Sequence, residues 1–259
     1  MSGVAITREG SVTTLTLDRP GRRNAFSPAT MTGLTAAVRE ADADPLVRVV
    51  VLAGDGPTFC AGADIEWMRA GRDADGTRNL EEAEALRDGF EALDTCGKAV
   101  IARVHGAAIG GGAGLVACAD VAVAADDTRF AFAEVRLGLV PATIAPYVVR
   151  AIGPGAARSL FTSGRAFDAD EALRLGLVHH VVPPASLDTA VREVVDLFLQ
   201  AGPEAIASCK RMIRDATSSL QLPDLPQRIT EARISDEGRE GLDAFLEKRS
   251  PSWAQSTDS

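Results

Sequence analysis

Two short segments rich in glycine and alanine hold the residues best suited to chemistry. Residues 104–115 pass from an apolar, strand-like stretch through a glycine-dense turn into an apolar, helix-compatible stretch. Backbone N–H groups at such a turn lack partners and can converge on an anion. Residues 59–65 have the same design, with small residues at a turn and Asp64 placed to cap a following helix. The two clusters of N–H groups together predict one oxyanion hole.

The elements that would position these turns alternate between strand and helix patterns. Strands are predicted over 12–18, 47–53, 99–104, 121–125, 129–133 and 178–182, and helices over 28–41, 80–95, 141–152 and 167–175. Ser27 and Asp168 suit the N-caps of two of these helices. Residues 69–77 are rich in Gly, Asp and Arg and predict a mobile loop that could cover a ligand. The pattern favours a layered α/β core over 1–200 and a helical region over 201–259.

Composition restricts the class of partner. The chain has 259 residues and a formal net charge of -9, which argues against binding nucleic acid or an anionic membrane surface. Four cysteines without C-x-x-C pairing suit reduced thiols better than disulfides or a zinc site. We find neither a signal-peptide pattern nor an apolar run near the roughly 20 residues that span a bilayer. A cytoplasmic protein is expected.

Five segments, in this order and spacing, resemble the enoyl-CoA hydratase/isomerase family, also called the crotonase superfamily. They are 24–26, 59–65, 105–115 with Asp120, 134–141 and 172–178. The resemblance implies a spiral of ββα units and a helical C-terminal region that packs trimers, often paired into hexamers. It also implies an acyl-CoA thioester as substrate, with coenzyme A part of that substrate, no other cofactor and no metal.

The resemblance implies a role for individual residues. Ala63 and Gly111 would supply the oxyanion-hole amides, Glu134 the catalytic carboxylate, and the carbonyl near Ala61 a contact to adenine. A thioester that exchanges an α proton, or takes a nucleophile at its β carbon, passes through an enolate. One pre-aimed N–H donor typically stabilises such a charge by on the order of 3 kcal/mol. Further candidates for contacts to coenzyme A are Arg22, Arg23, Ala25, Asp64, Ile65, Lys210 and Lys248.

Glu134 lies in an apolar setting, between Phe132-Ala133 and Val135. Desolvation there would raise the carboxyl pKa toward a range useful for proton transfer. A structural ion pair with Arg129 or Arg136 is the alternative.

Position 114 departs from the family pattern. Hydratases with two catalytic glutamates carry the first of them there, whereas this chain has Gly114. Single-glutamate members include enoyl-CoA isomerases, but a methylglutaconyl-CoA hydratase-like subgroup also resembles this chain, above all over 134–153. We therefore expect a hydratase for a branched or glutaconyl-type enoyl-CoA, with water oriented by backbone carbonyls or held in the void beside Gly114. An isomerase, or a non-catalytic protein that binds acyl-CoA, is the alternative.

Several other residues allow more than one interpretation. Gly112, Gly114 and Ala117 match the letters of a dinucleotide-binding fingerprint, but that motif alone is weak and leaves 59–65 unexplained. Trp67 and Met68 could border an acyl pocket or pack in the core. Arg69 and Arg72, which follow them, could meet a substrate carboxylate or lie in a solvated loop.

Overall fold

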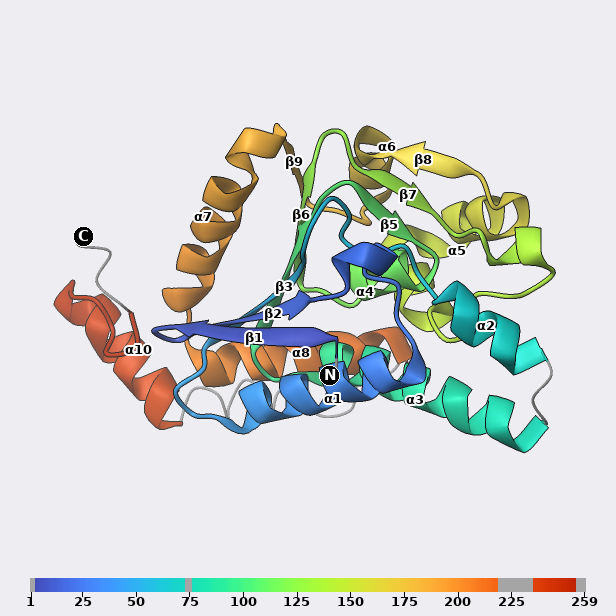
Figure 1. Cartoon of the computed structure of the whole chain (residues 1–259). Helices are drawn as coiled ribbons and strands as arrows, with labels where there is room; N and C mark the ends of the chain where they lie inside the picture. Colours follow the sequence, from blue (N-terminus) through green and yellow to red (C-terminus); the bar gives the residue numbers. More distant parts are fainter. Residues whose placement is uncertain (1–2, 73–75, 219–234, 255–259) are drawn as a thin grey trace.

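The computed structural model describes residues 3–72, 76–218 and 235–254, and in these ranges nine strands form two sheets (Figure 1). The larger sheet has the order β1-β2-β3-β4-β6-β9, in which β1 and β2 are antiparallel and the other pairs parallel. The smaller sheet has the order β5-β7-β8. The strands are β1 Val4–Glu9, β2 Val12–Leu17, β3 Val49–Gly54, β4 Ala99–Val104, β5 Ala107–Ile109, β6 Val121–Ala125, β7 Arg129–Ala131, β8 Ala166–Asp168 and β9 His180–Val182.

Helices cover both faces of the larger sheet. The α-helices are α1 Pro28–Ala43, α2 Ile65–Arg72, α3 Gly76–Thr95, α4 Gly111–Ala117, α5 Ala145–Ser163, α6 Ala169–Leu175, α7 Leu187–Leu199, α8 Pro203–Ser218 and α10 Asp236–Glu247. Short 3-10 helices are η1 Pro20–Arg22, η2 Glu134–Leu137 and η3 Pro184–Ser186. Figure 1 shows α7 on the opposite side of the sheet from α1 and α3.

Strand β3 is buried along its whole length, as its unbroken apolar sequence predicts. Val50 and Leu52 belong to the core cluster shared with α1 and α3, whereas Val49 and Val51 belong to the cluster shared with α7. Because side chains alternate along a strand, one short segment contributes to two cores. The sheet therefore forms a rigid middle layer from which the loops at its edge project.

Two of the expected N-caps are confirmed. The Ser27 hydroxyl accepts a hydrogen bond from the Thr30 amide at the start of α1, and Asp168 accepts one from Glu171 at the start of α6. The four cysteines carry no disulfide in the structure, and three of them are buried. Burial raises the pKa of the Cys60 thiol to about 12, so it is not a reactive nucleophile.

Other sequence expectations are wrong in detail. The loop expected over 69–77 is helical wherever it is described, since α2 runs to Arg72 and α3 begins at Gly76; residues 73–75 lie outside the described ranges. The helix expected over 141–152 begins later and continues past Gly153, where a φ of 74° kinks it. Strands β1, β5 and β8 were not expected, because β1 is a largely exposed edge strand and the other two have only three residues each. Since β8 extends to Asp168, the helix expected over 167–175 begins only at Ala169.

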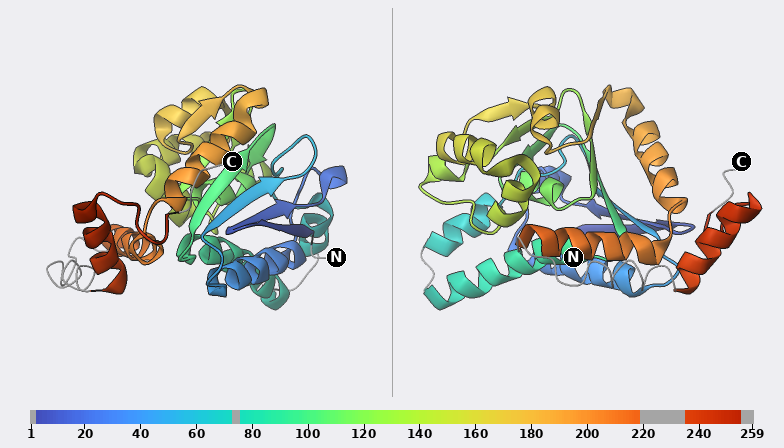
Figure 2. Two further views of the ribbon diagram at one scale, coloured as in Figure 1. Left: turned by 90° about the vertical axis from the view of Figure 1, so that its left-hand side faces the viewer. Right: turned by 180° about the vertical axis from the view of Figure 1, so that it is seen from behind.

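The C-terminal region is attached to the core through Arg48. Its guanidinium donates to the carbonyl of Ala201 at 2.6 Å and to that of Trp253 at 2.9 Å. Helix α10 lies at one end of the molecule and α2 at the other (Figures 1 and 2). Within the described ranges, we find no helix long and apolar enough to cross a membrane.

Candidate active site

Backbone hydrogen bonds bring the two glycine-rich segments side by side. The Cys60 amide donates to the carbonyl of Ala107 at 3.0 Å, and the Ile109 amide donates back to Cys60 at 3.0 Å. The Phe59 amide donates to His105, also at 3.0 Å. Two segments some fifty residues apart in the sequence therefore lie side by side, joined by an isolated parallel bridge between Cys60 and Ala108, as one shared oxyanion hole requires.

The amide of Ala63 is aimed by a single pair of hydrogen bonds on its other side. Phe26 donates to the carbonyl of Gly62 at 2.9 Å and accepts from the Asp64 amide at 2.8 Å, which makes an isolated parallel bridge between Phe26 and Ala63. In extended backbone, successive peptide groups point in opposite directions. The N–H of Ala63 therefore points away from Phe26, and no hydrogen bond within the described residues uses it.

Glycine is required where the two segments meet, because their backbones approach closely. A Cβ on Gly62 would lie 2.6 Å from the Ile109 carbonyl oxygen and 3.9 Å from the Gly111 nitrogen. Because Ala63 directly follows Gly62, the 3.9 Å distance brings the N–H groups of Ala63 and Gly111 close together. The Gly111 N–H begins α4 and, like that of Ala63, has no acceptor among the described residues.

Glu134 lies against this pair of turns. Its Oε1 is 2.8 Å from where a Cβ would stand on Gly110, whose φ of 55° suits glycine. Its Oε2 is buried and has no hydrogen-bond partner in the described part of the chain. Desolvation raises the pKa of the Glu134 carboxyl, although its own backbone amide opposes that effect. A buried, unpartnered carboxyl of this kind is suited to exchange protons with a ligand.

The structural alternative for Glu134 is not observed. None of the ion pairs recorded for the described residues includes Glu134, so neither Arg129 nor Arg136 neutralises it. The side chain of Arg136 instead lies against Gly164, where its Cγ is 3.0 Å from a Cβ placed on that residue.

The expectation of a water-filled void beside Gly114 is wrong. A Cβ on Gly114 would clash with Ile144, with the Ile144 Cβ only 2.8 Å away, and would lie 3.3 Å from Cε1 of Phe90. Both neighbours are buried, at 1% and 0% exposed. Gly114 is therefore required for close packing of α4 against the start of α5, and the space in front of it is filled by hydrocarbon.

Most of the residues assigned to coenzyme A gather beside Ala63. The Ala61 amide donates to the carbonyl of Arg23 at 2.9 Å, and Arg22 pairs with Glu66 at 2.9 Å on the surface. Ile65 is 68% exposed at the start of α2. Ala25, in contrast, is buried.

The Asp64 carboxylate is occupied within the protein. It pairs with Arg19 at 2.8 Å and accepts a hydrogen bond from the Glu66 amide at 2.9 Å, so it caps α2 as the sequence predicted. Burial acts to raise the pKa of Asp64, but the hydrogen bonds from Arg19 and from the amides of Glu66 and Trp67, with the charge of Arg19, together hold it below its usual range.

The two lysine candidates lie elsewhere. Lys210 donates to Asp120 at 2.6 Å and to the Lys98 carbonyl at 2.9 Å, which joins α8 to the core. Lys248 follows α10, at the end of the molecule away from α2 (Figure 1). The structure does not bring either lysine together with Ala61 or Arg22 in the same chain.

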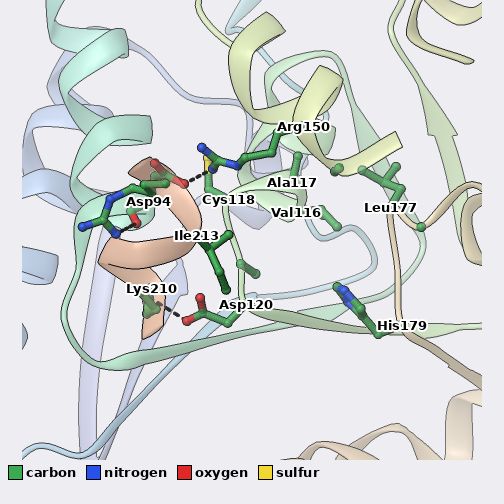
Figure 3. Close-up of a pocket in the computed structure, with 14 residues that line it drawn as sticks. Asp94, Val116, Ala117, Cys118, Asp120, Arg150, Leu177, His179, Lys210 and Ile213 are labelled. Atoms are coloured by element: carbon green, nitrogen blue, oxygen red, sulfur yellow. Dashed lines mark hydrogen bonds and ion pairs between the residues drawn. The ribbon is translucent and has the colours of Figure 1, made fainter. Parts of the chain in front are cut away.

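A cavity of about 260 Å³ lies at the C-terminal end of α4, where Val116 and Ala117 line it (Figure 3). Gly111 begins α4, and Glu134 lies against Gly110 just before it, at the opposite end of this helix. The ion pairs Arg150–Asp94 and Lys210–Asp120 form part of its wall. None of Glu134, Ala63 and Gly111 lines it, so this cavity is separate from the candidate site.

The helix after Asp64 packs on the core. Trp67 is half-buried against the main core cluster and donates through its indole nitrogen to Glu82 of α3. Arg69 is exposed on the same helix, and the side chain of Arg72 lies outside the described part of the structure. Among the described residues, no group of three or more His, Cys, Asp or Glu side chains could hold a metal ion.

Comparison with known proteins settles the family. The profile of the enoyl-CoA hydratase/isomerase family matches residues 7–256. The chain belongs to this family. A crotonyl-CoA hydratase of Syntrophomonas wolfei is 32% identical, with 95% of each chain covered, and a carnitinyl-CoA dehydratase of Citrobacter koseri is 34% identical, with 95% of this chain and 96% of that one covered.

The fold comparison agrees with the family assignment. The crystal structure of an enoyl-CoA hydratase from Shewanella pealeana superposes with a TM-score of 0.92 at 35% identity, over 97% of this chain and 96% of that one. The expected crotonase fold, with its helical C-terminal region, is thereby confirmed.

Two residues of the site were missed by the sequence analysis. Arg19 lies 45 positions before its partner Asp64, and Ile144 lies 30 positions after Gly114. A signal for Arg19 was available, because it precedes the turn Pro20-Gly21 close to the 24–26 segment. Nothing local marks Ile144 as the neighbour of Gly114.

Proposed function

We propose that this protein is an enoyl-CoA hydratase, adding water across the double bond of an enoyl-CoA thioester. One observation carries the proposal: the Glu134 carboxyl, with its buried and unpartnered Oε2, faces a turn whose neighbouring N–H groups, from Ala63 and Gly111, have no acceptor within the described chain. A thioester oxygen accepting from both amides would bring its α and β carbons near that carboxyl.

The proposed reaction can proceed with one carboxylate. Glu134, as the anion, takes a proton from water while the water oxygen bonds to the β carbon. The electron pair of the double bond moves to the thioester oxygen, where the two amides stabilise the enolate. The protonated Glu134 then returns its proton to the α carbon, and the C=O bond re-forms. Atoms and charge balance, and the site returns to its starting state.

Isomerisation is the second candidate function, and the packing at Gly114 supports it. Glycine has no side chain to act as a second acid or base, and Ile144 fills the space beside it. In an isomerase, the same Glu134 would remove a proton from one carbon and return it two carbons away, without water. Hydration and isomerisation would share the enolate and differ only in whether water has room beside the substrate.

We propose a branched or glutaconyl-type acyl group as the substrate. Its support is the sequence resemblance over 134–153, a segment that includes Ile144, which packs against Gly114 of α4. The exposed side chains of Leu137, Leu139 and Val140 follow Glu134 and offer apolar surface near the site. Arg22, Arg23 and the Ala61 carbonyl are the proposed contacts to coenzyme A.

We also propose that the helical region over 201–259 packs copies of the chain into a trimer or hexamer. Met212 and Ile213 of α8, which are 37% and 53% exposed, supply apolar surface for such a contact. Ile206 of the same helix instead packs partly on the core cluster that α7 shares with the sheet. Leu242, Phe245 and Leu246 have side chains outside the described part of the structure.

A panel of three thioesters tests the assignment. The purified protein is given crotonyl-CoA, 3-methylglutaconyl-CoA and a 3-enoyl-CoA, and product masses are recorded. A gain of one water identifies a hydratase, whereas a moved double bond at unchanged mass identifies an isomerase. Tight binding without turnover of any of the three would identify a non-catalytic protein and refute the proposal.

Glu134→Gln tests the role of the carboxylate. The amide preserves the shape but cannot exchange protons, and general acid–base groups typically contribute about 100- to 10,000-fold. We expect turnover to fall by that factor while affinity for a saturated acyl-CoA stays within several-fold. Near-native turnover in the variant would remove Glu134 from the mechanism.

A further inference from the structure

One guanidinium holds both sides of the backbone bridge that presents the Ala63 N–H. Arg19 donates through Nη1 to the carbonyl of Ala25 at 2.5 Å and through Nη2 to Oδ2 of Asp64 at 2.8 Å. Ala25 precedes Phe26, and Asp64 follows Ala63. The contacts of Arg19 therefore close a ring around the Phe26–Ala63 bridge.

The bridge needs such a clamp because it is isolated. Phe26 and Ala63 pair outside any named strand, so no further rungs of a ladder fix their relative orientation. The direction of the Ala63 N–H is set next to it by the two hydrogen bonds to Phe26, and the same two segments are joined once more where the Ala61 amide donates to the Arg23 carbonyl. A small rotation of residues 62–64 would turn that donor away from a thioester oxygen while leaving the surrounding core intact.

The loop that carries Arg19 is itself held in place. Asn24, which is 1% exposed, accepts from the Arg19 amide at 2.9 Å and donates through its side chain to the carbonyls of Asp55 and Thr58, each at 2.7 Å. The Asn24 amide donates back to the Arg19 carbonyl at 3.0 Å. The backbone of Arg19 is thus fixed to the turn after β3, and its side chain reaches the bridge from a rigid base.

Charge makes a second contribution. The side chain of Asp64 is only 6% exposed, and Arg19 is the cation paired with it. Without that cation, a buried negative charge would stand one residue from the amide that must receive an enolate oxygen. Like charges close together in a poorly solvated site repel strongly.

We propose that Arg19 is a positioning residue of the oxyanion hole: it does not touch the substrate, and it fixes the Ala63 N–H by clamping Ala25 and Asp64. This proposal rests on the proposed function, because that function needs an oxyanion hole formed by the Ala63 and Gly111 amides. It adds a residue outside the glycine-rich turns to the machinery that would stabilise the enolate.

Three variants test the proposal. Arg19→Met removes both contacts, and Arg19→Lys keeps the charge but can reach only one of the two acceptors. Arg8→Met is the matched control, because it breaks the 2.7 Å ion pair between Arg8 of β1 and Asp44, the residue that follows α1. Circular dichroism and thermal unfolding establish that each protein is folded at the assay temperature.

The first readout measures kcat and KM separately, with the thioester of the panel that the native protein turns over fastest. Losing one oxyanion donor typically lowers kcat by about 100- to 1,000-fold, and a misaimed donor should cost less, so we expect about 10- to 100-fold for Arg19→Met with KM within about threefold. Arg19→Lys should lie between this variant and the native protein, and Arg8→Met should match the native protein.

The second readout needs only binding. A hydrogen bond weakens a carbonyl, so the infrared C=O stretch of a ¹³C-labelled saturated acyl-CoA should fall when the native protein binds it. In Arg19→Met the stretch should move back toward that of the unbound thioester. A native-like shift in folded Arg19→Met would overturn the role of Arg19 alone, even if the native protein turned over no enoyl thioester. A native protein that binds the thioester without any shift would remove the oxyanion hole, and with it both proposals.

Discussion

Gly110→Ala should disable the site by moving Glu134 while leaving every catalytic group in the chain. The added Cβ would lie 2.8 Å from Oε1 and 3.4 Å from Cδ of Glu134. Since ordinary van der Waals contact begins near 3.4 Å, the carboxyl must retreat by about half an ångström. A misplacement of 1 Å can lower turnover by about 100-fold, so we expect a loss of about 10-fold or more in kcat.

Gly10→Ala is the control for a Cβ placed at a positive φ without a new contact. Gly10 has a φ of 56°, against 55° for Gly110, and a Cβ there would meet nothing within 4 Å. A positive φ strains an L-residue at both positions, and at Gly110 the ψ of −121° lies outside the left-handed helical region, which adds strain there. Both proteins should therefore melt at lower temperature, but only Gly110→Ala should lose kcat with affinity for saturated acyl-CoA nearly unchanged. Equal kcat in the two variants would refute the position assigned to Glu134.

Three further predictions follow from the same geometry. Because burial raises the pKa of Glu134, this side chain contributes stability that is fully present below its unfolded pKa and is lost as the pH rises through its folded pKa. Urea unfolding should therefore show Glu134→Gln gaining stability relative to the native protein between pH 4 and pH 8; a constant difference would contradict this. Gly114→Glu alone should fold poorly, because its Cβ meets Ile144, while Gly114→Glu with Ile144→Gly should fold better and hydrate crotonyl-CoA; thermal unfolding of both, with an assay of the pair, checks it. Light scattering at micromolar concentration should show an oligomer in the native protein, and Met212→Glu with Ile213→Glu should dissociate it; a native monomer would contradict this.

Local patterns predicted those parts of the fold that are decided locally. The apolar run of β3 and the alternation of β2 gave strands at the expected places, because burial on both faces or on one face leaves a direct trace in the sequence. The caps at Ser27 and Asp168 were predictable because the donor lies three residues away. The helical character of 69–72 was not predicted, since packing of Trp67 on the core outweighs the weak helix propensity of glycine nearby.

The site was predictable to the extent that its motifs are contiguous. The two glycine-rich turns and Glu134 were found in the sequence, and their juxtaposition is made by hydrogen bonds between Cys60 and the residues of β5. The neighbour of Gly114 was not predictable, because glycine at 114 indicates equally well an open space or a close approach. Only the fold decides between an open space and a close approach, and it places Ile144 against Gly114.

The packing of Ile144 on Gly114 has a consequence for how such sites can evolve. A carboxylate cannot enter position 114 while isoleucine stands at 144, because the intermediate sequence would carry a steric clash in the core. The opposite order of substitutions is possible. Replacing Ile144 by a smaller residue first leaves a cavity, which a chain can tolerate at some loss of stability. The substitution that admits a second acid thus lies thirty residues away from the acid itself, and it has to come first.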